Sequence, residues 1–117
     1  MIEFYSFGKL VFNGDTYTKD LIILCNKQDI KVISNWWRKE GHFLQNVDLE
    51  EVWSFSPEYL VIGTGANGCM KVAQEVLDKA KKLDIQVISQ LTSQAVDTFN
   101  NLLKQGKKIA GAFHLTC

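Results

Sequence analysis

A glycine-rich turn at Gly63, Gly65 and Gly68 is the part of the sequence best suited to binding a ligand. It directly follows an apolar run at 60–62, and residues of helical pattern come after it. A Gly-x-Gly-x-x-Gly turn between a strand and a helix leaves backbone N–H groups free to bind an anion or a nucleotide phosphate. Gly63, Thr64, Gly65 and Gly68 are therefore candidate ligand-binding residues. The alternative interpretation is a turn with a purely structural role.

A dinucleotide is a poor match for this turn. The dinucleotide-binding fingerprint needs an acidic residue at the end of the next strand. That strand ends here in Ser89, Gln90 and Leu91, and Asp84 lies before it instead. The sequence also lacks the Gly-Lys-Ser/Thr of a P-loop. We therefore expect no cofactor, and a small anion as the ligand that would suit this turn.

Cys69 is the best candidate for a nucleophile. The sequence pattern predicts a helix over 68–83, which places this thiol in the first helical turn. A helix N-terminus favours the reactive thiolate form of cysteine. In an enzyme of this kind, Arg38 or His42 would orient a small anionic substrate. The alternative is a cysteine packed under the helix as a small apolar residue, because free cysteines are commonly buried.

Aromatic and basic side chains gather at Trp36, Trp37, Arg38 and His42. We expect a strand over 30–38, in which the two adjacent tryptophans face opposite ways. One would then lie in the core and the other at the surface or at the mouth of a pocket. Arg38 is suited to binding a carboxylate or phosphate through two parallel hydrogen bonds, so Trp37 and Arg38 are further candidate ligand-binding residues. The alternative is a surface cation stacked on an aromatic ring at a strand end.

His114 and Cys117 are metal-binding residue types at close spacing. Residues three apart on a strand point to opposite faces, so this pair is unsuited to one metal ion and we expect no metal site. The three cysteines, Cys25, Cys69 and Cys117, are odd in number and far apart. This argues against a disulfide framework and favours a reducing cytoplasm.

The elements that position these residues fall into two halves. Residues 1–40 have the patterns of β structure, with an all-apolar strand predicted over 21–25, and Asn13-Gly14-Asp15 indicates a tight hairpin turn. Asp48 and Glu51 have the spacing of a capping box, and Thr92 is the predicted N-cap of a later helix. The predicted elements of the second half are strands at 59–62, 85–88 and 108–115 and helices at 49–55, 68–83 and 92–105.

This order of elements predicts an α/β fold. Strand, helix, strand, helix, strand implies right-handed crossovers and three parallel strands. The N-terminal β hairpins extend or flank that sheet. With 117 residues the chain has the usual length of one domain, and we expect a single domain over 1–117.

Charge and hydropathy exclude two classes of partner. Lys plus Arg and Asp plus Glu number 13 each, and the basic residues are scattered, so we expect no nucleic-acid binding. No apolar run approaches the ~20 residues that span a bilayer, so we expect no membrane span. The first residues lack the basic and apolar regions of a signal peptide.

Several motifs along the chain resemble a known family. They are Phe7-Gly8 with Asn13-Gly14 and Tyr17, Trp36-Trp37-Arg38 with Gly41-His42, Leu60 to Gly65, Thr92 with Ala95 and Asn100, and the closing His114-x-Thr116-Cys117. The family consists of small single-domain proteins of unknown biochemical function. It includes the mitochondrial complex I assembly factor of this fold and the vertebrate adipogenesis-associated domain protein. The segment from Arg38 to His42 is shorter here than in the family.

The resemblance implies a three-layer α/β domain with a central mixed sheet, and it implies no established enzyme activity or cofactor. Together with the incomplete catalytic motifs, it favours a non-enzymatic binding or assembly-type protein. Such a protein would act through a protein partner or a second copy of itself, and could hold a small anion at the turn from Gly63 to Gly68. The alternative is an enzyme that acts on a small anionic substrate with Cys69 as nucleophile.

Overall fold

A mixed sheet of five strands forms the centre of the computed structural model, which describes all residues from Met1 to Cys117. Its strands, in spatial order, are β5 (Ile30–Ile33), β4 (Leu21–Cys25), β10 (Ile109–Phe113), β7 (Tyr59–Gly63) and β9 (Gln86–Gln90). β10, β7 and β9 run parallel to one another, while β4 pairs antiparallel with β10 and β5 pairs antiparallel with β4. The predicted parallel strands and the central mixed sheet are therefore confirmed.

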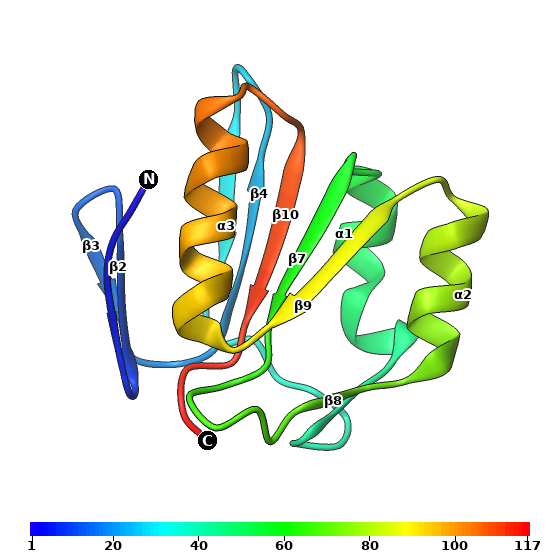
Figure 1. The fold of residues 1–117 in the computed structure, drawn as a ribbon, viewed down its shortest axis with the longest axis horizontal. Helices are drawn as coiled ribbons and strands as arrows, with labels where there is room; N and C mark the ends of the chain where they lie inside the picture. Colours follow the sequence, from blue (N-terminus) through cyan, green and yellow to red (C-terminus); the bar gives the residue numbers. More distant parts are fainter.

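Two helices connect the parallel strands. α2 (Gln74–Lys82) lies between β7 and β9 in the chain, and α3 (Thr92–Lys104) lies between β9 and β10. The two connections move in opposite directions across the sheet, and their helices pack on opposite faces (Figure 1). Two crossovers of the same hand that move in opposite directions must place their helices in this way.

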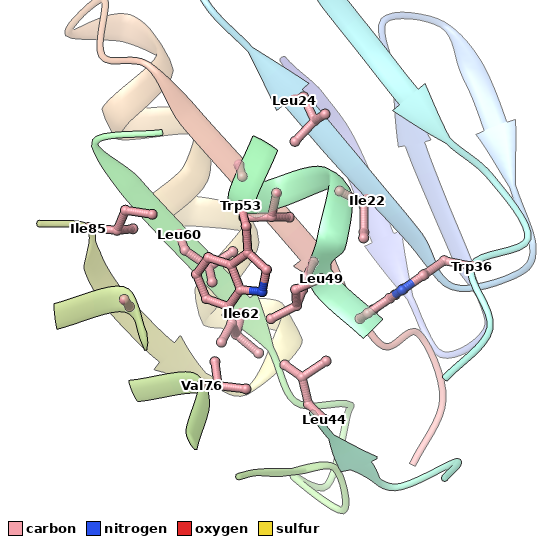
Figure 2. Close-up of a cluster of buried hydrophobic side chains, with 14 of the residues drawn as sticks. Ile22, Leu24, Trp36, Leu44, Leu49, Trp53, Leu60, Ile62, Val76 and Ile85 are labelled. Atoms are coloured by element: carbon pink, nitrogen blue, oxygen red, sulfur yellow. The ribbon is translucent and has the colours of Figure 1, made fainter. Parts of the chain in front are cut away.

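One face of the sheet is covered by α1 (Glu50–Phe55), α2 and the 3₁₀ turn η1 (Asn46–Leu49). Trp53 and Leu49 lie over Leu60 and Ile62 of β7, and Val76 of α2 completes this side of the core (Figure 2). Alternate residues of β7 point to this face because successive side chains of a strand point to opposite faces. The cluster contains 16 buried residues, so this face holds more than half of the core.

The opposite face is covered by α3 and by a separate antiparallel sheet of β1 (Ile2–Ser6), β2 (Lys9–Phe12) and β3 (Asp15–Tyr17). Phe99 of α3 packs edge-to-face against Phe12 and Phe113. The side chain of Asn100 joins the two elements, because it accepts from the Ile2 N–H at 2.8 Å and donates to the Ile2 carbonyl at 2.9 Å. The small sheet and α3 form the third layer.

The predicted helix over 68–83 is wrong over its first six residues, 68–73. α2 begins only at Gln74, and the residues before it form a loop with the short strand β8 (Lys71–Val72), which pairs with β6 (Phe43–Leu44). Gly65 and Gly68 have φ of +109° and +72°, a conformation that an α-helix cannot contain. Met70, which is 1% exposed, is buried beneath this loop.

Three further details differ from the sequence interpretation. The strand predicted over 30–38 ends at Ile33, because Asn35 takes a left-handed conformation with φ +51°. Asp48 closes an earlier turn instead of capping α1, since its carboxylate accepts from the Gln45 N–H at 2.8 Å. Thr92 is the first residue of α3 and Leu91 is its N-cap, because the Thr92 hydroxyl donates to the His114 carbonyl at 2.6 Å.

Candidate functional site

Asp20 and His114 are brought together by the pairing of two central strands. β4 and β10 run antiparallel with Leu21 opposite Phe113, so the residue before β4 lies beside the residue after β10. His114 Nδ1 lies 2.7 Å from Asp20 Oδ2, and the Leu115 N–H donates to Asp20 Oδ1 at 2.8 Å. Both oxygens of this carboxylate are therefore engaged by the segment that follows β10.

Arg38 joins this pair from the loop that follows β5. Its Nη2 lies 2.8 Å from Asp20 Oδ2 and its Nε donates to the Gly41 carbonyl at 2.7 Å. The guanidinium also stacks on Trp36, 4.9 Å from the ring centroid. Only 6% of the Arg38 side chain is exposed, so Arg38 is not the surface cation of the alternative interpretation, although it does stack on a ring.

The cluster of Asp20, Arg38 and His114 leaves two buried nitrogens without a partner. They are Arg38 Nη1 and His114 Nε2. A buried N–H without an acceptor costs about 1–3 kcal/mol, and more for a charged group. Since Arg38 Nε and Nη2 are already bonded, Nη1 is the part of the guanidinium that remains for an incoming acceptor.

A cavity of about 160 Å³ opens beside this cluster, and we call it the Arg38 pocket. Its lining residues are Lys19, Asp20, Asn35, Trp36, Trp37, Arg38 and Gly41. Trp36 is buried whereas Trp37 is 84% exposed, so the prediction of one core and one surface tryptophan is confirmed. The Lys19 ammonium makes no ion pair, and the Asn35 amide makes no hydrogen bond, so both are free to meet a ligand.

The glycine-rich turn lies at the same end of the sheet, but most of its N–H groups are engaged by the chain itself. The backbone oxygen of Cys117 accepts from the Asn67 and Cys69 N–H groups at 3.0 and 3.1 Å. The Ala66 N–H donates to the Thr116 carbonyl at 2.7 Å. Cys117 thus supplies the oxygen that a bound anion would bring to a turn of this kind.

Cys69 does not lie at a helix N-terminus, because α2 begins five residues after it. Its side chain is exposed, and no hydrogen bond joins it to His42 or His114. His42 instead packs edge-to-face on the His114 ring, with 5.2 Å between centroids. The structure therefore brings Arg38, His42 and His114 together and leaves Cys69 outside that group. Nor does it gather three His, Cys, Asp or Glu side chains in a way suited to a metal ion.

Residues 2–114 match the model of a family described as "Protein of unknown function (DUF498/DUF598)". The chain belongs to this family. The family's description assigns no biochemical function, so a proposal for this member must come from its own geometry.

Solved structures of proteins from several organisms have the same fold as this chain. A conserved hypothetical protein of Pyrococcus horikoshii is 23% identical, with 100% of this chain and 99% of that one covered and a TM-score of 0.79. A Bartonella henselae protein described as an outer membrane protein is 24% identical over 99% and 94% of the chains, with a TM-score of 0.77. A Xanthomonas campestris protein is 18% identical over 98% and 83%, with a TM-score of 0.79. At such identities these likenesses establish the fold alone.

In this DUF498/DUF598 member, no helix combines the length and apolar character needed to cross a bilayer.

The sequence interpretation missed two charged residues that line the Arg38 pocket, Lys19 and Asp20. In the sequence, these residues are marked only by their position directly before the all-apolar strand β4. The strand that pairs with β4 brings His114 beside Asp20, and the local sequence does not specify that pairing.

The charge of Asp20 makes the stability of this family member depend on pH. Burial raises the pKa of the carboxyl group, but the hydrogen bonds from His114, the Leu115 N–H and Arg38 outweigh burial and hold the pKa below its usual value of 3.8. A carboxyl group whose pKa is lowered by folding stabilises the protein above its unfolded pKa, and this stabilisation is lost as the pH falls through the folded pKa.

We therefore expect the difference in unfolding free energy between the natural protein and Asp20→Asn to be largest near neutral pH. Asparagine resembles the protonated acid in shape and charge, so the difference should shrink as the pH falls below 3.8. Urea unfolding at pH 7 and at pH 3 measures it. An equal difference at both values would show that the charge of Asp20 contributes nothing.

Proposed function

We propose that the protein is a non-enzymatic binding protein that holds an acidic group in the Arg38 pocket. The observation that supports this best is the buried Arg38 Nη1, which has no hydrogen-bond partner. Because Arg38 lines the pocket, an entering carboxylate oxygen would satisfy this nitrogen once the side chains that cover it move aside. Guanidinium and carboxylate groups match in geometry and charge, and hydrogen bonds between ionised groups are the strongest of their kind.

The charge of the pocket favours an acid over a base. Two of its lining residues, Lys19 and Arg38, are cationic, and Asp20 is the one anionic residue. The Asp20 carboxylate already accepts from Arg38, His114 and the Leu115 N–H, so it has little capacity left for a cationic ligand. The Lys19 ammonium is left to provide a second contact to the incoming anion.

The size of the pocket restricts what can enter it. Sites for drug-sized ligands measure about 300–1,000 Å³, whereas this cavity measures about 160 Å³. We propose a small organic acid or a single acidic side chain as the occupant. Trp37 at the mouth would pack against the apolar part of either, because aromatic side chains are enriched where proteins bind partners.

An acidic side chain as occupant would agree with an assembly-type role through a protein partner, as the likeness to the complex I assembly factor suggests. A second copy of the chain could supply that side chain in a homodimer.

The three unpaired cysteines suit a reducing cytoplasm, where we place the protein as a single domain. The glycine-rich turn is a weaker anion site because Thr92, Thr116 and Cys117 accept from most of its N–H groups.

No observation favours the enzyme alternative as strongly. Cys69 is exposed and lacks a base within hydrogen-bonding distance. A nucleophilic cysteine is activated by an adjacent base or by a lowered pKa. The binding role therefore takes precedence.

Binding of an acid to the Arg38 pocket should change the tryptophan fluorescence, because Trp37 lies at its mouth. We expect small carboxylic acids to give a saturable change and their methyl esters to give none. Lys19→Gln should weaken binding about two- to fivefold, the range for one exposed ion pair. Lys27→Gln is the matched control, because this exposed lysine follows β4 at its other end.

The same titration separates the two sources of the acid. A short peptide that contains one glutamate should bind more tightly than the free acid if a protein partner supplies the group. Equal effects of Lys19→Gln and Lys27→Gln, or equal binding of acid and ester, would contradict the proposed site.

A further inference from the structure

Cys69 and Cys117 are far apart in the sequence but adjacent in the structure. The Cys69 N–H donates to the Cys117 backbone oxygen at 3.1 Å. A Cα atom lies about 1.5 Å from its own nitrogen and about 2.4 Å from its own carbonyl oxygen, so the two Cα atoms are less than about 7 Å apart. Disulfides join cysteines whose Cα atoms are about 4.4–6.8 Å apart. The backbone contact therefore limits the Cα separation of this pair to about the upper end of the range in which a disulfide can form.

The two thiols are also the accessible ones. Cys69 is exposed and Cys117 is partly exposed, whereas Cys25 is buried. Burial raises the pKa of the Cys25 thiol to about 11, which keeps it protonated and unreactive near neutral pH. An oxidant in solution would therefore meet only the pair at the turn.

We propose that Cys69 and Cys117 form a reversible disulfide by exchange with a low-molecular-weight disulfide such as oxidised glutathione. The Cys69 thiolate attacks one sulfur of glutathione disulfide, forming a mixed disulfide and releasing one reduced glutathione. The Cys117 thiolate then attacks the Cys69 sulfur, forming the internal bond and releasing the second glutathione. The protein loses two electrons and two protons in total, and glutathione disulfide gains them.

The bond would fasten the segment after β10 to the glycine-rich turn. That segment begins with His114, whose ring contacts Asp20 and His42. Oxidation would thus fix one wall of the buried cluster behind the Arg38 pocket, while reduction would leave it held by hydrogen bonds alone. The disulfide does not depend on the acid-binding role, since it rests on the contact between Cys69 and Cys117.

The test is the intact mass of the folded protein after incubation with oxidised glutathione. We expect a species lighter than the reduced protein by two hydrogen atoms and free of glutathione, with a Tm raised by roughly 5–15 °C. Dithiothreitol should reverse both changes. Cys25→Ala should show the same loss of mass and the same rise in Tm on oxidation, because Cys25 takes no part.

The single variants locate the bond. Cys69→Ser and Cys117→Ser should each stop at one bound glutathione on the remaining thiol and show no rise in Tm. The proposal is overturned if the natural protein carries two glutathiones without an internal bond. It is equally overturned if the oxidised species is a disulfide-linked dimer of two chains.

Discussion

Asp20→Ala is expected to lower the free energy of unfolding by about 3–5 kcal/mol, the cost of removing one partner from a buried ion pair. Asp20 is the shared acceptor of Arg38 and His114, whose side chains are only 6% and 5% exposed. Without it the guanidinium stays buried and loses its counter-charge. The Leu115 N–H loses its acceptor as well. A single substitution thus removes all three contacts of this carboxylate.

Thermal unfolding measures the effect, and Tm should fall by roughly 10–25 °C. Asp97→Ala is the matched control, because Asp97 is an exposed aspartate on α3 without an ion pair. Its substitution should change the unfolding free energy by less than about 0.5 kcal/mol. Similar losses in the two variants would show that the cluster is not a stabilising unit.

Gly65→Ala is expected to lower the free energy of unfolding by roughly 2–5 kcal/mol, because it adds backbone strain and overpacking. A Cβ atom at this position would lie 2.4 Å from the Cys117 carbonyl carbon, 2.6 Å from its oxygen and 2.8 Å from His114 Cδ2. Its φ of +109° is also unfavourable for any residue with a side chain. The substitution would therefore displace the segment that carries His114.

Gly14→Ala separates the two contributions. Gly14 has a φ of +83°, but a Cβ atom there would meet nothing within 4 Å. Gly14→Ala should therefore lower the free energy of unfolding by the backbone strain alone, about 1–2 kcal/mol. The difference between the variants, measured by urea unfolding, reports the packing of the turn against Cys117. If Gly65→Ala lowers the free energy of unfolding no more than Gly14→Ala does, that packing does not contribute to stability.

The sequence was sufficient to predict the order and type of the main elements. The apolar runs at 21–25 and 59–62 became central strands, and the helical stripe that contains Phe99 became α3. These are local patterns, because a buried face repeats with the period of the element that carries it. The helix before Gln74 was overpredicted since apolar spacing does not report the positive φ of Gly65 and Gly68.

The candidate site was predicted only in part. Trp36, Trp37 and Arg38 were identified because their residue types are suggestive wherever they occur. Asp20 was missed, since its role depends on which strand pairs with β4 and in which register. The glycine-rich turn was correctly placed at the end of a strand, but its partner, Cys117, lies about fifty residues further along the chain and no local pattern points to it.

The most direct measurement is a titration of the isotope-labelled protein with a small carboxylic acid, followed by NMR. If the acid binds in the Arg38 pocket, the signals of the Arg38 guanidinium and the Trp37 indole shift together and saturate at one affinity. The backbone amides of Asn67 and Cys69, which donate to Cys117, then change little. Shifts confined to those two amides, with the Arg38 and Trp37 signals unchanged, would place the acid at the glycine-rich turn and contradict the proposed site.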